Sequence, residues 1–199
     1  MVFIHMKKIF LRLILSFGLV SSFSVVAGGA TFQMANLVDL PAITENGGAG
    51  TLIRTKNAVK ASLSFNQLEL ATAYSVWWVV FNFPENCANG PGACGPDDLA
   101  DPSLVGGAVF HAGGFITGTN NTATVNVDLK AGNLPNGLDA LIPGGLIRGN
   151  GYRAEIHLVL RSHGTIINSM AAKQIATFMG ACEINACADT QATVFAPVE

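Results

Sequence analysis

Four carboxylates lie close to a short loop that Cys87 and Cys94 bracket, one before it and three after it. They are Glu85, Asp97, Asp98 and Asp101. Carboxylate and carbonyl oxygens are the ligands that Ca²⁺ prefers, and a cross-linked loop would lower the cost of ordering them. Pro96 followed by two aspartates is also how a short helix begins, because carboxylates cap free N–H groups there. The segment lacks the D-x-D-x-D-G pattern of EF-hand loops, so a helix start is favoured and calcium is the alternative.

A second set of polar side chains centres on the segment EIHLVLRSHG. It comprises His111, Glu155, His157, Arg161 and His163. The last four share one parity and would project from one face of a strand. At about 3.3 Å per residue, His157 and His163 would lie roughly 20 Å apart on a straight strand, too far for one metal ion. We therefore favour a solvated face on which Arg161 forms an ion pair, either with Glu155 or with a carboxylate on a neighbouring strand. A ligand-binding face, or a Zn or Cu site of the three histidines, is the alternative.

The segment Tyr74 to Phe83 is apolar on both faces, with Trp77 on one face and Trp78 on the other. Exposed aromatic residues would suit stacking on carbohydrate or docking to a protein, but packing in a core is the favoured interpretation. The chain has neither a G-x-S-x-G nor an H-E-x-x-H motif. The sequence therefore does not predict an enzyme.

The four cysteines form two local pairs with spacings C-x6-C and C-x4-C. These spacings lack the C-x2-C knuckles of structural zinc sites, so zinc is the less favoured alternative. We predict the disulfides Cys87–Cys94 and Cys182–Cys187, formed in an oxidising compartment.

Short runs of alternating apolar and polar residues, separated by Gly, Pro and Asn, predict strands. We expect them at 59–66, 74–83, 105–111 (continuing past 113–114 as a bulge), 123–129, 154–161, 174–179 and 192–196. The strands at 105–111 and 123–129 are expected to form a meander. Residues 31–53 are ambiguous between an edge strand and a helical turn, and 130–151 form a long connection with at most a helical turn at 138–142. This pattern predicts an all-β fold, an antiparallel β-sandwich with long Gly/Pro/Asn-rich loops, with barrel-like closure as the alternative.

The first residues are typical of a signal peptide, with Lys7, Lys8 and Arg12 before an apolar run. Small residues predict cleavage after Ala27, or alternatively after Ala30, and an uncleaved anchor is a further alternative. We expect 1–27 to be removed and 28–199 to form one domain, secreted or periplasmic, with no membrane span after cleavage.

The charge and the hydrophobic content of the chain limit the kinds of partner that it could bind. Loss of three basic groups with the signal peptide would lower the formal net charge of −2 by three, which disfavours nucleic acid. A content of 50% hydrophobic and only 12% charged residues is typical of a folded chain and not of an intrinsically disordered one.

The stretches WWVVFNFPENC, CGPDDL and EIHLVLRSHG resemble a family of exported bacterial proteins without an assigned activity. The resemblance covers most of the mature chain and implies an exported β-fold. A looser similarity links the histidine-bearing strand to β-sandwiches of the copper-zinc superoxide dismutase and chordin types. Those dismutases carry an H-x-H pair on one strand, whereas His157 and His163 lie six residues apart here.

These features favour an exported, non-catalytic binding, adhesion or matrix-associated module that contacts carbohydrate or a protein surface. The alternative is a metal-binding protein or metal-dependent enzyme that uses the acidic loop or the histidine-bearing strand. Elemental analysis of protein purified without added metal separates the two.

Overall fold

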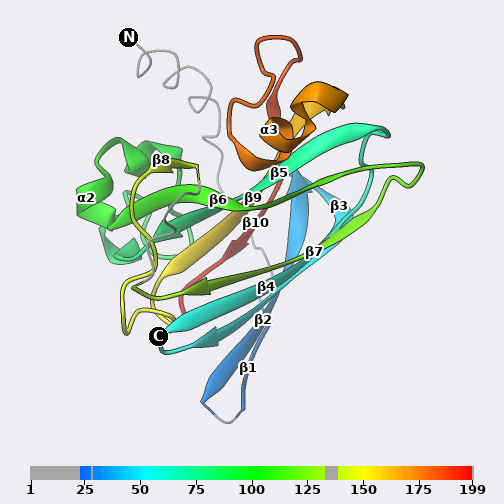
Figure 1. Ribbon diagram of the computed structural model, residues 1–199. Coiled ribbons are helices and arrows are strands. Elements are labelled where there is room, and N and C mark those ends of the chain that lie inside the picture. The colour runs from blue at the N-terminus through cyan, green and yellow to red at the C-terminus, as the bar shows by residue number, and fades with distance from the viewer. Residues whose placement is uncertain (1–22, 28, 133–138, 199) are drawn as a thin grey trace.

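A single antiparallel sheet dominates the computed structural model, which describes residues 23–27, 29–132 and 139–198 (Figure 1). The strands are β1 (Phe23–Ala27), β2 (Ala30–Asp39), β3 (Thr44–Thr55), β4 (Ala58–Phe65), β5 (Thr72–Phe81), β6 (Gly107–Ile116), β7 (Ala123–Lys130), β8 (Ala140–Ile142), β9 (Glu155–Thr165) and β10 (Ala188–Phe195). The connections carry the short helices η1 (Pro84–Asn86), η2 (Pro96–Ala100), α2 (Pro102–Val105), η3 (Asn168–Met170) and α3 (Ala171–Ala176).

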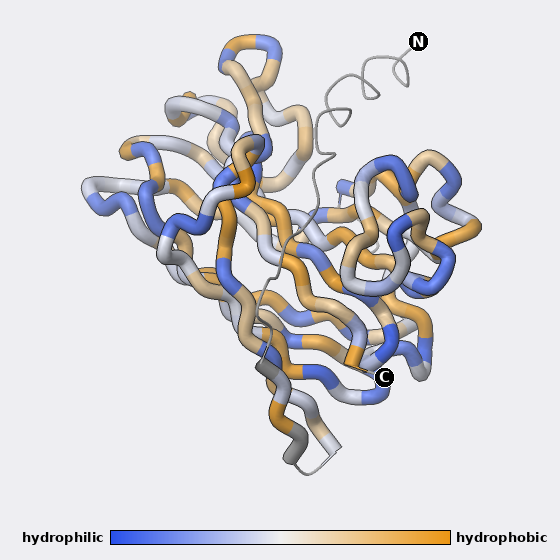
Figure 2. Tube along the Cα trace, turned by 180° about the vertical axis from the view of Figure 1, so that it is seen from behind, coloured by the Kyte–Doolittle hydropathy of each residue, from blue (hydrophilic) through white to orange (hydrophobic). Residues whose placement is uncertain are grey.

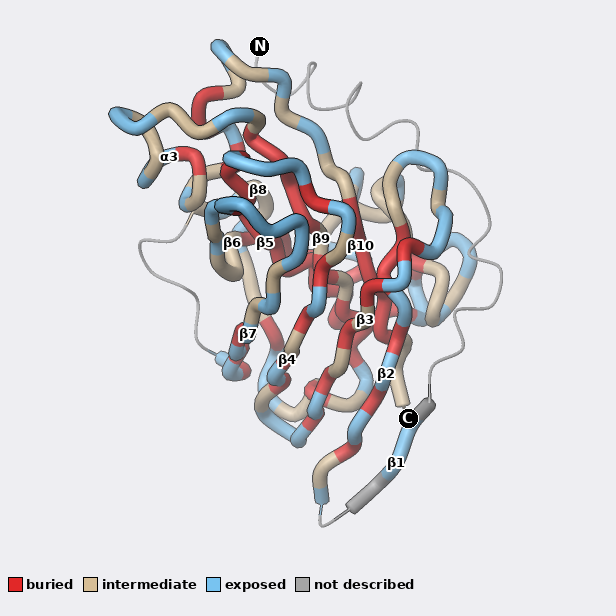
Figure 3. The backbone as a smooth tube through the Cα atoms, turned by 90° about the vertical axis from the view of Figure 1, so that its right-hand side faces the viewer, coloured by how far each residue is buried: buried red, intermediate tan, exposed pale blue. Residues whose placement is uncertain are grey.

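The strand order is β7-β4-β3-β2-β10-β9-β5-β6-β8, and β1 pairs with β2 beside this path. All of these pairs are antiparallel. The predicted all-β antiparallel class is therefore confirmed. The described residues do not form the two separate sheets of a sandwich, because the one sheet curls into a half-barrel (Figures 1 and 3).

The hydrophobic core lies inside this curl. In β4 the alternating residues Val59, Leu63 and Phe65 are buried, while Lys60 between them is exposed, as the sequence predicts for a half-buried strand. Phe65 stacks on Phe115 of β6 with ring centroids 5.9 Å apart, although β4 and β6 are not neighbours in the sheet. Side-chain contacts across the core, between strands that are not neighbours, therefore hold the sheet in its curled form.

Strand β5 is buried along its whole length between β9 and β6, as a central strand. Its residues Tyr74 and Trp78 face the core inside the curl. Trp77 and Phe81 face the opposite side, where loops cover them with a second apolar cluster. Figure 2 shows hydrophobic residues concentrated along the central strands. We call this loop-covered side of β5, β6 and β9 the outer face.

The predicted meander and the predicted strand at 174–179 are both wrong. Strands β6 and β7 do not form a meander, because β6 pairs with β5 and β8 whereas β7 pairs with β4. The strand expected at 174–179 is helix α3 followed by turns. The helix buries Gln174, whose side chain donates to the main-chain oxygens of His163 and Thr165 and accepts from the N–H of Ile167. These bonds supply partners for the buried amide of Gln174, which would point to solvent in the predicted strand.

The ambiguous segment 31–53 forms strands β2 and β3. In the connection 130–151, residues 133–138 lie outside the described part. Residues 140–142 form strand β8 instead of the expected helical turn.

Most of the predicted signal peptide lies outside the described residues. Its last residues form β1, which pairs with β2 from Phe23 opposite Met34 to Ala27 opposite Ala30. Among the helices of the described residues, none has the length and apolar character needed to cross a membrane.

A fully buried arginine ties β3 to distant parts of the chain. Arg54 donates to the side-chain oxygen of Gln33 and to the main-chain oxygens of Gly151, Ala154, Phe195 and Ala196 at 2.7–3.0 Å. The five N–H groups of a guanidinium can serve five acceptors. Burial lowers the pKa of Arg54 from its ordinary value to about 9. The side chain therefore stays charged near neutral pH.

Candidate functional site

The predicted local cysteine pairs are both present. Cys87–Cys94 closes the loop after β5, and Cys182–Cys187 closes the segment before β10. Both sulfurs of the first pair are buried in the cluster that covers the outer face. This disulfide therefore belongs to the cover of the outer face. We call residues 83–106, which contain it, the stapled loop.

The aspartates of the stapled loop shape its backbone. Asp98 accepts the N–H of Gly95 at 2.7 Å and that of Ala88 at 2.8 Å, and helix η2 begins at Pro96 as predicted. The hydroxyl of Ser103 donates to Asp101 at 2.5 Å and is the main cause of the lowered pKa of that carboxyl. Asp98 thus has the predicted capping role.

Potential metal ligands come together in threes at two places in the described part of the chain. The groups are His163, Cys182 and Cys187, and Cys87, Cys94 and Asp98, with ligand atoms within 4.8 Å. In both groups the cysteines are joined in a disulfide, so their sulfurs are not thiolate ligands. Neither group reproduces the predicted calcium set or the set of three histidines. Metal binding by Glu85, Asp97, Asp98 and Asp101 stays a prediction.

Glu155 anchors the stapled loop to β9. Its fully buried carboxylate accepts the N–H of Gly92 at 2.5 Å and that of Cys94 at 3.1 Å. The same carboxylate lies 2.7 Å from Nε2 of His157, whose ring packs against Phe81 with centroids 5.1 Å apart. Three hydrogen bonds to one buried carboxylate make Glu155 the centre of this end of the outer face.

Arg161 makes the cross-strand ion pair that we expected as one alternative, but on a buried face. Its Nη1 lies 2.7 Å from the carboxylate of Asp189 on β10, and its Nε donates to the main-chain oxygen of Phe178 at 2.9 Å. The guanidinium also lies 3.8 Å from the centre of the Phe178 ring. The predicted solvated face is wrong here, because the segment that follows β9 covers this strand.

His163 lies in a buried polar chain. Its Nδ1 is 2.9 Å from the main-chain oxygen of Gly180, so Nδ1 carries the proton. Its Nε2 accepts the hydroxyl of Ser75 at 2.7 Å, and the Ser75 oxygen accepts the indole N–H of Trp77, also at 2.7 Å. Burial lowers the pKa of His163 from 6.5 to about 4. Cys187 Sγ lies 3.5 Å from Nδ1, so the second disulfide packs beside the ring.

His111 has its own partners. Its Nε2 lies 2.8 Å from the main-chain oxygen of Ile175 in helix α3, and its ring meets Trp77 edge-on at 5.6 Å. His111 and His163 thus connect the outer face to helix α3 and to the turn at Gly180, whereas His157 contacts Glu155 and Phe81 on the sheet itself. Sequence reasoning found His111, Glu155, His157, Arg161 and His163 but missed Ser75, which has no motif around it.

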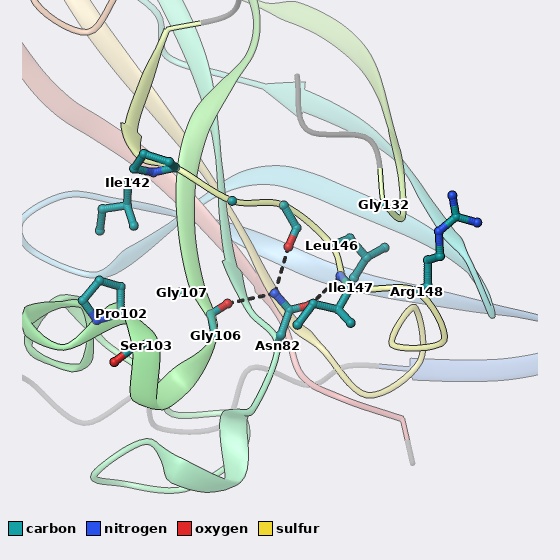
Figure 4. Close-up of a pocket in the computed structure, with 13 residues that line it drawn as sticks. Asn82, Pro102, Ser103, Gly106, Gly107, Gly132, Ile142, Leu146, Ile147 and Arg148 are labelled. Atoms are coloured by element: carbon teal, nitrogen blue, oxygen red, sulfur yellow. Dashed lines mark hydrogen bonds between the residues drawn. The ribbon is translucent and has the colours of Figure 1, made fainter. Parts of the chain in front are cut away.

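A pocket of about 750 Å³ lies where the start of β6 meets the connection after β8 (Figure 4). Its wall is largely apolar, with Pro102, Ile142, Leu146 and Ile147, and its polar lining residues are Asn82, Ser103 and Arg148. In the view of Figure 4, Asn82 lies between Ile142 on one side and Arg148 on the other.

Asn82 shapes the pocket. Its amide donates to the main-chain oxygens of Gly106 and Gly145 at 2.8 and 2.9 Å and accepts the N–H of Ile147 at 2.9 Å. Arg148 is exposed and has no carboxylate within ion-pair distance among the described residues. The pocket residues were not predicted, because Gly and Pro in a connection indicate a turn and give no sign that the segment lines a pocket.

Comparison with protein-family models, with curated proteins and with solved structures gives no match. The resemblance to exported bacterial β-proteins stays a prediction.

Proposed function

We propose that this chain is an exported binding module that takes a small, largely apolar ligand with an anionic group into the pocket between β6 and the connection after β8. The observation that carries the proposal is the pocket, whose volume of about 750 Å³ falls in the range of ligand sites. Export fits the two disulfides, which form in oxidising compartments. The signal peptide and the secreted or periplasmic location are part of the proposal.

The ligand class follows from the lining. Ile142, Leu146 and Ile147 offer apolar contact, and the hydrogen-bonding groups of the Asn82 side chain are engaged with the protein itself. Arg148 is the charged group of the lining and would attract an anion. An apolar body with one negative group matches both features.

The polar residues of the outer face support a binding role over a chemical one. Glu155 and His163 are buried and engaged in hydrogen bonds that hold covering segments onto the sheet. A structural role in holding these segments accounts for the presence of Glu155 and His163 on this face, with no need for a catalytic role.

Anilinonaphthalene sulfonate, an apolar dye with one negative group, is a suitable probe. We expect the folded protein to enhance its fluorescence, and Arg148→Gln to weaken binding about tenfold through loss of the charge partner. Ile147→Ser should also weaken it. Lys56→Gln and Ile184→Ser change an exposed charge and an exposed apolar residue outside the pocket and serve as matched controls. Absence of dye binding, or equal binding by both pocket variants and the controls, would contradict the proposal.

A further inference from the structure

The last residues of the predicted signal peptide occupy one edge of the sheet. Strand β1 pairs with the first half of β2, with Val25 opposite Phe32, and the hairpin of β1 and β2 extends beyond the other strands (Figures 1 and 3). Cleavage after Ala27 or Ala30 would remove β1 and leave this edge without a partner strand.

No other described strand covers the same edge. Strand β3 pairs with β2 on one side, and on the other side β10 pairs only with Val38 and Asp39. Beyond that point a side chain of β2 contacts the chain just after β10. Nε2 of Gln33 donates to the main-chain oxygen of Ala196 at 3.0 Å. Removal of β1 would therefore expose main-chain hydrogen-bonding groups along the first half of β2.

Apolar side chains border the exposed edge. Phe32 and Met34 are 38% and 46% exposed, and Ile53, which lies opposite Phe32 on β3, is 42% exposed. The stretch 31–38, TFQMANLV, contains no charged residue. Edge strands of soluble proteins usually carry charges or proline that prevent strand addition. This edge has neither, and it adjoins an apolar patch of the kind that marks a contact surface.

We propose that the edge of β2 in the processed protein binds β2 of a second copy of this chain. The two strands would pair antiparallel about a two-fold axis, with Gln33 opposite Gln33 of the partner subunit and Phe32 opposite Met34 of the partner subunit.

The pairing of β1 supports this occupant. The segment Phe23–Val25 reads Phe-Ser-Val, and Phe32–Met34 reads Phe-Gln-Met, with the same order of aromatic, polar and apolar residues. In the antiparallel register of β1, Phe23 lies opposite Met34 and Val25 opposite Phe32. A second β2 in this register would place its Phe32 at the position of Phe23 and its Met34 at that of Val25. In this register the sequence of a second β2 thus has the same order of residue types as the β1 segment that pairs with this edge.

The inference rests on the export and cleavage that belong to the proposed function, but not on the pocket. The experiment uses the protein secreted or released from the periplasm, with its intact mass measured first. We expect a mass that lacks Phe23–Ala27, and a dimer in sedimentation velocity that dissociates on dilution. A mass that retains Phe23–Ala27, or a monomer throughout the dilution series, would overturn the inference, and neither result depends on dye binding.

Charge variants test the register. Met34→Lys and Phe32→Glu should each raise the dimer dissociation constant at least about tenfold, because each puts a charge in the apolar contact. The double variant should regain most of the lost affinity, since Lys at 34 would face Glu at 32 of the partner subunit. Leu70→Lys, at a residue that is 56% exposed elsewhere, is the matched control and should leave the dimer intact. Dimerisation that is unchanged in both single variants would overturn the inference. Circular dichroism checks that each variant is folded.

Discussion

Ser75 Oγ lies 2.7 Å from Nε2 of His163, and both residues are 0% exposed. These are the atoms of a nucleophile and its base, but the serine oxygen also accepts the indole N–H of Trp77. The main-chain oxygen of Gly180 fixes the other ring nitrogen. The pair therefore closes a chain of hydrogen bonds that joins β5 and β9 to the segment before β10.

Ser75→Ala should lower the free energy of unfolding by about 2–4 kcal/mol, because the indole N–H of Trp77 and Nε2 of His163 both lose a buried partner. Urea unfolding measures the change. Ser64→Ala, at an exposed position of β4, is the control and should change stability by less than about 0.5 kcal/mol. Equal stability of the two variants would contradict the structural role of Ser75.

His163 should make the protein less stable in acid. Its pKa in the folded protein is about 4, below the ordinary value of 6.5, so between these values the unfolded chain binds a proton that the folded chain does not. Its contribution to stability is complete above the ordinary value and is lost as the pH falls toward about 4, by at most about 1.4 kcal/mol per pH unit.

Urea unfolding over this pH range tests the effect, with His163→Gln as the comparison. The variant should have a shallower fall of stability with acid than the natural chain. NMR of the folded protein near about pH 5 should still find the neutral ring of His163. A protonated ring at that pH would refute the prediction.

The sequence predicted those parts of the fold that depend on local pattern. The alternation from Val59 to Phe65 defines β4, and the apolar run around Trp77 and Trp78 defines a central strand with two covered faces. The pattern of β7 shows which side chains point inward but not which strand lies beside it, so its pairing with β4 was not predicted. The number of sheets was likewise not encoded in any single strand.

The same limit applies to the candidate site. Cysteine spacing predicted both disulfides, and Pro96 before Asp97 and Asp98 predicted the start of η2, because these features act within a few residues. Ser75 and His163 are 88 positions apart in the chain, and Arg54 and Ala154 are 100 apart. Partners so distant leave no periodic or spacing signal in one sequence. The folded topology alone brings them together.

Glu155→Gln should loosen the stapled loop. An amide has one oxygen in place of two, and its NH₂ group would face an N–H of Gly92 or Cys94, which is a donor against a donor. We expect a loss of about 1.5–3 kcal/mol and faster hydrogen exchange at both amides. Glu85→Gln, on an exposed residue of the same loop, is the matched control. Protection at Gly92 and Cys94 that survives the change would show that other contacts hold the loop.

Arg54→Lys should destabilise the protein although it preserves the charge. The ammonium has three donors in place of five, so it leaves some of the main-chain oxygens of Gly151, Ala154, Phe195 and Ala196 buried without a partner. We expect a loss of about 3 kcal/mol, measured by urea unfolding, with faster hydrogen exchange where β10 ends. Lys60→Arg on the exposed side of β4 makes the reverse exchange and should leave stability unchanged. Because Arg54 links β3 to the end of β10, a variant as stable as the natural chain would mean that the strand pairs alone close this side of the curl.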